Sequence, residues 1–270
     1  MQVNYHFHSR LSFDAEYPLT EMCRAAAAVG LRYLCLTDHC DLIDEYGKPD
    51  DSFSWKAQDR ELALARAQYP DLELRRGIEL GQAVMRPQAA EQVLSDPDID
   101  FVLGSMHNCL DGQDFYWMKF TDRQQCLKLL EEYFGCLLEL SRTDWLDALA
   151  HLNYPLRYMH FRDGVDVDLR PFGDLIRQIL QTLIQRGKAL EVNTSGYRQG
   201  MDAPLPPEEI LNMYRDLGGE LITIGTDAHE PAHMADGLDR GAALLEKCGF
   251  RYVTLYQKRR PYMIKLEDVL

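Results

Sequence analysis

Short apolar runs that end in a histidine or an acid recur along the whole chain. Six of the eight histidines belong to such runs. Side chains this far apart in sequence can converge only if the runs lie side by side with aligned ends, as the strands of a closed parallel barrel do. The runs cover residues 3–8, 33–39, 74–79, 101–107, 148–151, 189–193 and 221–229.

Helical patterns alternate with these runs, which favours parallel pairing because parallel neighbours need a crossover connection. Several of the helical segments are followed by glycine, a common C-terminal stop. No internal repeat, low-complexity tract or linker interrupts the alternation, so we predict an α/β barrel of seven or eight βα units in one domain, residues 1–270. The helices are expected at 19–29, 54–69, 123–140, 172–186, 207–217 and 234–247, before a final strand at 252–256.

Two stretches exceed the minimal barrel, residues 41–53 and 109–120. Both follow runs that end in histidine, so in a barrel they would rise from the C-terminal ends of the strands, where active sites are built. They are candidate lids over a site. The alternative is that they are solvated insertions in which Phe115, Tyr116 and Trp117 pack locally.

Charge and cysteine usage exclude several classes of protein. Acidic residues outnumber basic ones by 43 to 29, and the resulting net charge of −14 repels nucleic acid, although local arginines or bound cations can accept a small phosphorylated substrate. No apolar segment reaches membrane-spanning length, and no charged leader and apolar signal core opens the chain. The seven cysteines lack Cys-x-x-Cys spacing, which indicates buried free thiols. We therefore expect a cytoplasmic protein without a membrane partner.

The polar residues at the run ends have the types and spacing of metal ligands. His6 and His8 are two apart on a strand, so both side chains point to one face, and Phe7 between them faces the opposite, buried side. A carboxylate at Glu79 can bridge two cations, and Asp38 is a candidate acceptor behind His39. The full candidate set comprises His6, His8, Asp14, His39, Glu79, His107, His151, Asp227 and His229.

Each residue of this set also has an ordinary structural interpretation. A lone histidine at a strand end is more often a hydrogen-bonded packing residue, and Asp14 or Asp227 could be a turn or cap residue. Nine such residues at strand ends would bury a costly polar cluster unless metals occupied it, so the set as a whole predicts a metal site. His160 and His233 lie outside the pattern and are expected at the surface or behind the ligands.

Two arginines are candidates for binding phosphate. Arg198 follows the run at 189–193, and Arg157 follows His151 by six residues, so both could reach the same end of the barrel with a planar fork that suits phosphate. An isolated loop arginine usually lies at the surface, which is the alternative for each. The basic run Lys258, Arg259 and Arg260 is expected to be solvated.

Six sequence blocks resemble the PHP (polymerase and histidinol phosphatase) metallophosphoesterases, in the order found in that family. The segments EVNTSGYR at 191–198 and YVTLYQKRRPY at the end of the chain are similar to the stand-alone histidinol-phosphate phosphatases of the family. The blocks are HFHS at 6–9, LTDH at 36–39, GIELG at 77–81, GSMHN at 104–108, AHLNY at 150–154 and GTDAH at 225–229.

The resemblance implies a distorted TIM-like (β/α)7 barrel that holds two or three divalent ions at the C-terminal rim of the strands. It implies that His6, His8, Glu79 and Asp227 hold the first ion, that Glu79, His107 and His151 hold the second, and that Asp14, His39 and His229 hold the third. Many members carry histidine where Asp14 stands. The carboxylate would make the third site harder and more negative, which leaves zinc, iron and manganese all possible. Glu79, Asp227, Arg157 and Arg198 are the implied catalytic residues, the two arginines by binding the phosphate.

The function implied is hydrolysis of L-histidinol phosphate to L-histidinol and phosphate, a step of histidine synthesis. Bridging metals would lower the pKa of a bound water, so that metal-bound hydroxide attacks and no serine, cysteine or aspartate nucleophile is needed. Three alternatives remain at this stage: a related phosphoesterase for another small phosphate or nucleotide, a non-catalytic metal-binding regulatory module, and a barrel that hydrolyses a C–N bond.

Overall fold

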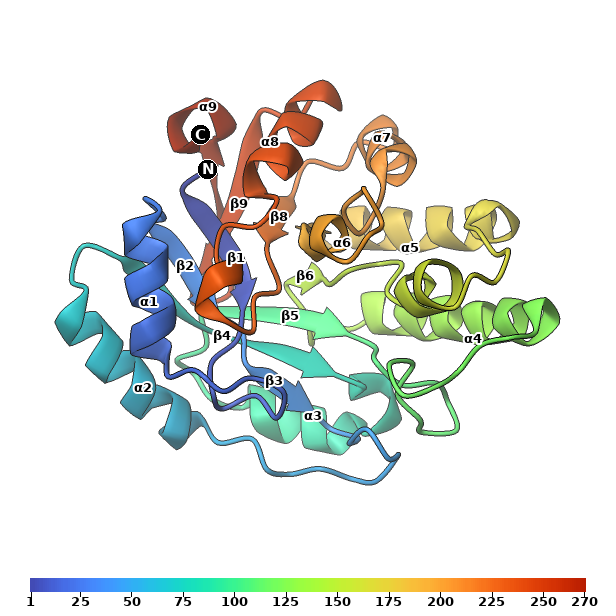
Figure 1. Cartoon of the computed structure of the whole chain (residues 1–270), viewed down its shortest axis with the longest axis horizontal. Helices are drawn as coiled ribbons and strands as arrows, with labels where there is room; N and C mark the ends of the chain where they lie inside the picture. Colours follow the sequence, from blue (N-terminus) through green and yellow to red (C-terminus); the bar gives the residue numbers. More distant parts are fainter.

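The computed structural model describes residues 1–270 and shows one parallel sheet with helices packed around its outside (Figure 1). The strand order is β1-β2-β4-β5-β6-β7-β8, and β3 pairs with β4 beyond the end of β2. The strands are β1 (Val3–Phe7), β2 (Tyr33–Leu36), β3 (His39–Asp41), β4 (Glu73–Gly81), β5 (Phe101–Ser105), β6 (Ala148–Leu149), β7 (Ala189–Asn193) and β8 (Ile222–Gly225).

The first and last strands of this order meet and close the sheet into a barrel. The amide of Asp227 donates to the carbonyl of His6, and the amide of His8 donates to the carbonyl of Ala228, both at 2.8 Å. Gly225 permits this approach, because a Cβ atom there would lie 2.2 Å from the Cβ of His6. The predicted barrel of parallel strands is confirmed, with seven strand positions; the eighth unit that the sequence allowed is absent.

All six predicted helices are present, covering the outside of the barrel (Figure 1). The sixth starts four residues later than expected, at Leu238, because Gly237 before it has a φ of 72°. The helix Pro87–Leu94 and several single turns were not expected. The helices are α1 (Leu19–Ala28), α2 (Trp55–Gln68), α3 (Pro87–Leu94), α4 (Arg123–Ser141), α5 (Gly173–Gln185), α6 (Ser195–Arg198), α7 (Glu208–Asp216), α8 (Leu238–Lys247) and α9 (Leu266–Val269). A π-helical turn lies at Arg157–Arg162, and 3-10 turns lie at Ala83–Met85, Arg170–Phe172 and Pro231–His233.

The final predicted strand does not join the barrel. It is β9 (Tyr252–Gln257), which pairs antiparallel with β10 (Arg260–Lys265). The turn between them packs across the N-terminal ends of the barrel strands: the amide of Lys258 donates to Asp100, just before β5, and Arg259 donates to the buried Asp147, just before β6, at 3.0 Å. The expectation that Arg259 is solvated was therefore wrong.

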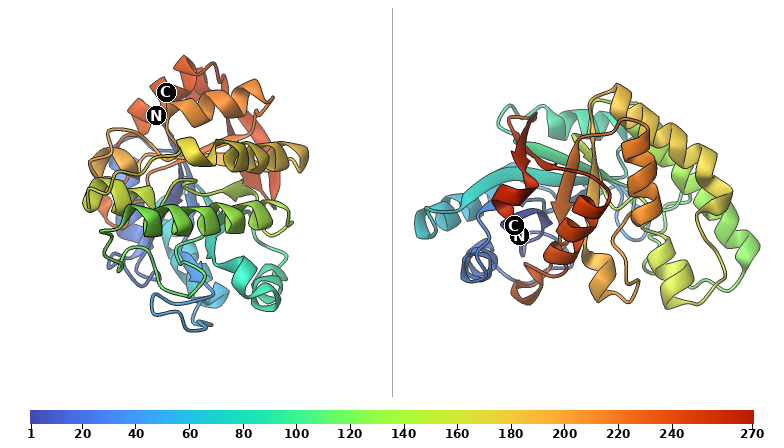
Figure 2. Two further views of the ribbon diagram at one scale, coloured as in Figure 1. Left: turned by 90° about the vertical axis from the view of Figure 1, so that its right-hand side faces the viewer. Right: turned by 90° about the horizontal axis from the view of Figure 1, so that it is seen from above.

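A continuous apolar interior of 73 buried residues fills the barrel and the space under the helices. All seven cysteines are free and buried, as predicted. None of the helices has both the length and the apolar character needed to span a bilayer. The termini lie together, with the amide of Gln2 donating to the carbonyl of Val269 at 2.5 Å (Figure 2).

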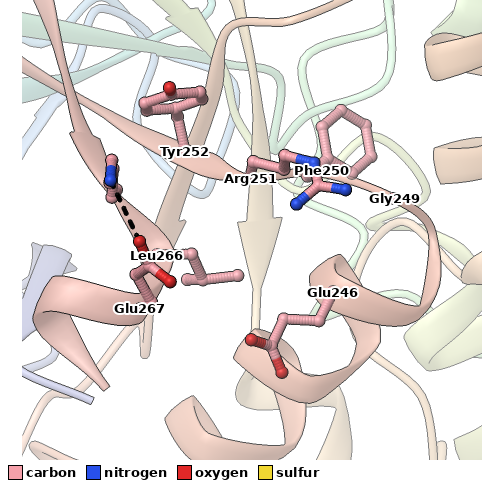
Figure 3. A pocket seen from close by; sticks show the side chains of 8 residues that line it. Glu246, Gly249, Phe250, Arg251, Tyr252, Leu266 and Glu267 are labelled. Carbon is pink, nitrogen blue, oxygen red and sulfur yellow. Dashed lines mark hydrogen bonds and ion pairs between the residues drawn. The ribbon is translucent and has the colours of Figure 1, made fainter.

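A surface hollow of about 390 Å³ lies between the end of α8, the start of β9 and α9 (Figure 3). Its lining includes Glu246, Phe250, Arg251 and Glu267, and none of the residues that end the barrel strands. The chemistry predicted from the sequence belongs to the other end of the barrel.

Candidate metal centre

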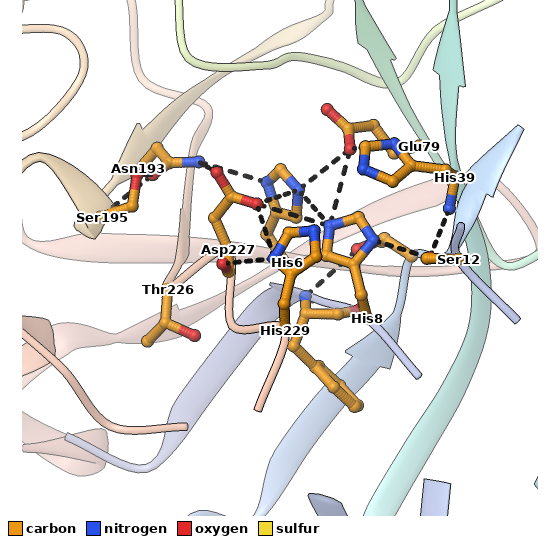
Figure 4. A network of polar contacts seen from close by, with 12 residues as sticks. His6, His8, Ser12, His39, Glu79, Asn193, Ser195, Thr226, Asp227 and His229 are labelled. Carbon is orange, nitrogen blue, oxygen red and sulfur yellow. Dashed lines mark hydrogen bonds and ion pairs between the residues drawn. The ribbon is translucent and has the colours of Figure 1, made fainter. Parts of the chain in front are cut away.

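The structure brings all nine predicted ligands together at the C-terminal ends of the barrel strands, and we call them the strand-end cluster. Several of them face one another in Figure 4. Parallel strands bring their carboxyl ends to one rim, which is why residues more than two hundred positions apart meet. His6 lies in β1, His8 just after it, Asp14 in the loop before α1, His39 at the start of β3, Glu79 in β4, His107 after β5, His151 after β6, and Asp227 and His229 after β8.

Glu79 occupies the centre of the strand-end cluster. Its Oε1 lies 3.1 Å from His107 Nε2 and 2.8 Å from His151 Nε2. Its Oε2 lies 3.3 Å from His6 Nε2 and 3.2 Å from His39 Nδ1, yet has no hydrogen-bond partner although it is fully buried. Burial would raise the pKa of Glu79, but the surrounding imidazoles, His107 first, lower that pKa well below its usual value. Glu79 is thus an ionised carboxylate with each oxygen aimed at a different group of histidines.

The first implied ligand set has the spacing that a metal ion requires. His6 Nε2 lies 3.2 Å from His8 Nε2 and 3.5 Å from Asp227 Oδ1, and His8 Nε2 lies 3.4 Å from the same oxygen. Two ligands at about 2.1 Å from a tetrahedral ion are about 3.4 Å apart. Asp227 reaches this position with a φ of 54°, a backbone conformation that aspartate tolerates better than most residues.

The third implied set lies nearer to solvent than the other two. Asp14 Oδ1 is 3.6 Å from His39 Nε2, and Asp14 Oδ2 is 3.1 Å from His229 Nε2. The structure also brings His8 to this group, since the ligand atoms of His8, His39 and His229 all lie within 4.8 Å of one another. Burial lowers the pKa of His39, but Asp41, Asp14 and Glu79 together raise it to about 10.

The second ring nitrogen of several cluster histidines contacts an oxygen atom outside the cluster. His6 Nδ1 donates to Glu191 Oε1 at 2.6 Å, and His107 Nδ1 donates to Asp41 Oδ1 at 3.2 Å. His8 Nδ1 lies 3.0 Å from Ser12 Oγ. With the proton on Nδ1, the Nε2 lone pairs of these rings face the cluster, which is the usual arrangement behind a metal-bound histidine. Imidazole and carboxylate ligands of this kind suit zinc, iron or manganese.

Sequence reasoning missed Asp41 and Glu191 and misplaced Asp38. Asp41 is the first residue of the extra stretch at 41–53, but in the structure it ends β3 and reaches both His39 and His107. Asp38 is not an acceptor for the His39 ring: it accepts from the amide of Ser9 at 2.6 Å and from Ser12 Oγ at 3.1 Å. Asp38 therefore acts on the cluster through Ser12. The signal that could have found Asp41 is its spacing of two from His39, which places both on one strand face.

Arg157 and Arg198 both line the cavity beside the strand-end cluster. Arg157 is buried, its Nη2 donates to Ser195 Oγ at 2.6 Å, and its Nε has no partner. Arg198 donates from its two Nη atoms to the carbonyls of Thr226 and Asp227, each at 2.5 Å. Arg157 thus keeps a free donor, whereas Arg198 holds the backbone that carries Asp227. His160 and His233 lie outside the cavity lining, as expected.

The cavity has a volume of about 510 Å³ and reaches from the strand-end cluster to the two extra stretches. Residues 41–53 contribute Glu45, and residues 109–120 contribute Asp114, Tyr116 and Trp117. The two stretches touch each other next to the cavity, where the amide of Asp114 donates to the carbonyl of Glu45 at 3.5 Å. The expected position at the rim is confirmed, and a lid movement stays a prediction. The local packing considered as the alternative holds for Phe115, which is buried against Tyr133.

The comparison with known proteins agrees with this geometry. The PHP domain matches residues 4–195. The chain is 26% identical over 261 residues to a histidinol-phosphatase of Lactococcus lactis, with 94% of both chains covered. It is 27% identical over 258 residues to a probable histidinol-phosphatase of Thermotoga maritima, with 95% of this chain and 97% of the relative covered.

Two solved structures share the fold. The histidinol phosphate phosphatase of Lactococcus lactis, complexed with zinc, L-histidinol and phosphate, superposes with a TM-score of 0.81 at 24% identity, covering 97% of this chain and 98% of its own. A putative histidinol phosphatase of Listeria monocytogenes gives 0.73 at 15% identity, covering 88% and 98%. Since the domain match spans most of the sequence and includes seven of the nine cluster residues, this chain belongs to the PHP domain family.

Proposed function

We propose that this protein hydrolyses L-histidinol phosphate to L-histidinol and phosphate. The observation that carries the proposal is the meeting of a ligand cluster centred on Glu79 with a buried arginine, Arg157, in one cavity. The near full-length similarity to proteins named histidinol-phosphatase supports the choice of substrate. So does the zinc, L-histidinol and phosphate found in the similar solved structure.

We infer that the strand-end cluster holds two or three divalent ions, with zinc, iron and manganese as candidates. The buried Glu79 Oε2, which no protein donor satisfies, supports a cation beside it, because an orphaned buried carboxylate oxygen is costly. Bound divalent cations would supply a water of lowered pKa and would neutralise the phosphate oxygens. Glu79 would contact two ions, and Asp227 would complete the set formed with His6 and His8.

The two arginines take different parts in this proposal. Arg157 would bind the phosphate through its unpaired Nε, since a planar guanidinium in a buried site suits a phosphate oxygen. Two donors of Arg198 bind the backbone carbonyls of Thr226 and Asp227, so Arg198 would orient Asp227. Because Arg198 also lines the cavity, its positive charge would attract the phosphate. Both guanidinium groups line the cavity, so both would bring positive charge to the transferred phosphate.

The acidic and aromatic part of the cavity lining fits an alcohol that carries an amine. Glu45 and Asp114 line it, and neither carboxylate forms an ion pair with any residue of the protein. Tyr116, Trp117 and Tyr154 add aromatic faces. Histidinol presents an ammonium for the carboxylates and an imidazole for the rings, so the substrate would bind with its phosphate toward Arg157 and its amine toward Asp114.

The remaining inferences concern the setting of the enzyme. We infer that the chain acts as one domain, because a continuous core of 73 residues underlies both halves of the barrel. A cytoplasmic location is also proposed, supported by seven cysteines that are all free thiols, as is usual in a reducing compartment.

Phosphate release by the purified, metal-loaded protein tests the proposed substrate. L-histidinol phosphate should be hydrolysed with a kcat/KM at least about a hundredfold above those of nucleotides and of phenyl phosphate. Only L-histidinol phosphate presents both a phosphate for Arg157 and an ammonium for the cavity carboxylates. A preference for nucleotides would reject the assignment in favour of a related phosphoesterase. A folded protein that binds metal but releases phosphate from none of these compounds would instead indicate a regulatory module.

A further inference from the structure

A polar segment that begins in β7 connects the strand-end cluster with Arg157. Glu191 and Asn193 are two apart on the strand, so both face the barrel interior. Ser195 starts α6, one residue beyond the end of the strand, after Thr194. All three side chains are buried. In Figure 4, Asn193 lies between Ser195 and Asp227.

Glu191 joins two strands that carry ligands. Its Oε1 accepts from His6 Nδ1 at 2.6 Å, and its Oε2 accepts from the backbone amide of His151 at 2.8 Å. Oε2 also accepts from Asn193 Nδ2 at 3.3 Å. Each oxygen of the Glu191 carboxylate thus accepts from at least one donor. That donor, His6 Nδ1 for Oε1 and the His151 amide for Oε2, has no acceptor closer than Glu191. Only a side chain with two acceptor oxygens satisfies this arrangement.

Asn193 continues the connection in the direction of Arg157. Its Nδ2 donates to Asp227 Oδ2 at 3.3 Å as well as to Glu191. Its Oδ1 accepts from the amide of Ser195 at 3.0 Å and from Ser195 Oγ at 2.5 Å. The side-chain amide is therefore fixed in one orientation, with its donor toward the metal ligands and its acceptor toward Ser195.

Ser195 determines what Arg157 can contact. Because the serine hydroxyl donates its proton to Asn193, its oxygen is left to accept, and it accepts from Arg157 Nη2 at 2.6 Å. The nearest carboxylate oxygen to that guanidinium, Asp227 Oδ2, is 3.6 Å away. The Ser195 contact is thus the short bond that directs a buried arginine toward the cavity.

We propose that Glu191, Asn193 and Ser195 are positioning residues that couple the metal ligands to the phosphate-binding arginine. Glu191 sets the ring of His6 for metal binding, Ser195 sets Arg157 for phosphate binding, and Asn193 links the two. The phosphate part rests on the proposed function of the site. The metal part depends only on the ligand cluster.

Zinc affinity tests the first half, measured on the metal-free protein by competition with a chromophoric chelator. In Glu191→Gln the amide group must point its NH₂ toward either His6 Nδ1–H or the His151 amide, so one donor faces another. We expect zinc binding about tenfold to a hundredfold weaker. Glu61→Gln is the matched control, because Glu61 is also buried and accepts from Arg10 and the Leu19 amide away from the cluster. Its zinc affinity should equal that of the unaltered protein.

Binding of inorganic phosphate to the zinc-loaded protein tests the second half, measured by calorimetry. Ser195→Ala should weaken phosphate binding about tenfold and leave zinc affinity unchanged, because Arg157 loses its acceptor while His6 keeps Glu191. Thr194→Val is the control, since this neighbouring hydroxyl donates to the carbonyl of Asp236 and does not touch Arg157. Asn193→Ala, which alters no charge, should weaken both zinc and phosphate binding.

These outcomes separate the proposal from a general structural role and from the choice of substrate. Unchanged zinc affinity in Glu191→Gln, or equal losses of zinc and phosphate binding in Ser195→Ala, would overturn it. Should Glu191→Gln not fold, the Asn193→Ala result decides, because retention of both affinities there removes the coupling. None of these measurements uses L-histidinol phosphate, so failure to hydrolyse that compound would refute the proposed function alone.

Discussion

Glu79 is the residue on which the chemistry of the site depends most directly. Its Oε1 lies close to His107 and His151, and its Oε2 lies close to His6 and His39. Glu79→Gln keeps the shape of the side chain but loses the negative charge that would hold two cations in the proposed site. We expect kcat for L-histidinol phosphate to fall at least about a hundredfold. This loss should exceed that caused by changing a residue that only contacts a ligand, such as Glu191. Steady-state kinetics with elemental analysis of bound metal would check this.

The outcome for Glu79→Gln is interpretable only if the barrel stays folded, which circular dichroism would establish. Glu61→Gln, a change at a buried glutamate of α2 remote from the cavity lining, is the matched control. Turnover by Glu79→Gln at the level of the unaltered protein would eliminate the bridging role.

Asp114 is the residue expected to select for the amine of the substrate. Asp114→Asn should raise KM for L-histidinol phosphate about tenfold and leave kcat/KM for phenyl phosphate within about twofold, because only the former carries an ammonium. Burial raises the pKa of Asp114. As the pH falls, its charge and the ammonium contact should therefore be lost at a higher pH than for an ordinary aspartate, and the Asn variant should lack this part of the pH dependence of KM.

Asp111→Asn provides the comparison for Asp114→Asn, since Asp111 belongs to the same stretch but does not line the cavity. Its kinetics should match those of the unaltered protein. An equal rise in KM for phenyl phosphate in Asp114→Asn would show that Asp114 affects the shape of the site and does not bind the amine of the substrate.

At the residue scale, the sequence predicted the positions of the histidines and carboxylates that end strands, and the structure brings all nine together. It did not predict Asp41 or Glu191. Both lie two residues from another polar residue on a strand, so a period-two signal existed. What the sequence lacked was the pairing between strands, which decides that Glu191 faces the ring of His6 and not solvent.

At the element scale, alternation of apolar runs and helical patterns was enough to predict the barrel. The apolar strand at 252–256 follows a helix, as the barrel strands do, so the sequence pattern does not distinguish β9 from them. A two-residue hairpin turn is normally signalled by glycine or asparagine, whereas here Lys258 and Arg259 occupy it with φ values of 50° and 58°. Contacts of the turn with Asp100 and Asp147 hold this conformation, and such tertiary contacts leave no local pattern in the sequence.

The hairpin is expected to stabilise the barrel through Arg259. Its Nε contacts both oxygens of the buried Asp147, at 3.2 and 3.0 Å, and its Nη2 donates to the carbonyl of Asp144. Arg259→Ala leaves that carboxylate without its cation, and should lower the free energy of unfolding by about 1–3 kcal/mol in urea. Arg260→Ala, at an exposed neighbour without an ion pair, should change it by less than about 0.5 kcal/mol. Equal effects of the two variants would contradict the role of the Asp147 contact.

At the scale of the whole molecule, closure of the barrel brings many charged side chains together at the C-terminal ends of the strands. Five carboxylates of the cluster and its surroundings, Asp14, Asp41, Glu79, Glu191 and Asp227, lie among six imidazoles and two arginines. The chain carries a net charge of −14, so gathering these carboxylates in its interior is unfavourable unless positive charge balances them. Bound cations would offset this repulsion, so metal binding and stability should be linked.

Removal of metal should therefore lower both activity and thermal stability. Exhaustive chelation is expected to abolish phosphate release from L-histidinol phosphate and to lower Tm, because a ligand that binds only the folded state at about 100 times its Kd contributes about 2.7 kcal/mol. Zinc, iron(II) or manganese should restore both, while magnesium should not, since it prefers oxygen ligands and the cluster is mostly imidazole. Glu79→Ala is the control, in which added zinc should raise Tm much less. Full activity in a protein shown by elemental analysis to lack these metals would refute the metal dependence, and with it the proposed role of the strand-end cluster in the reaction.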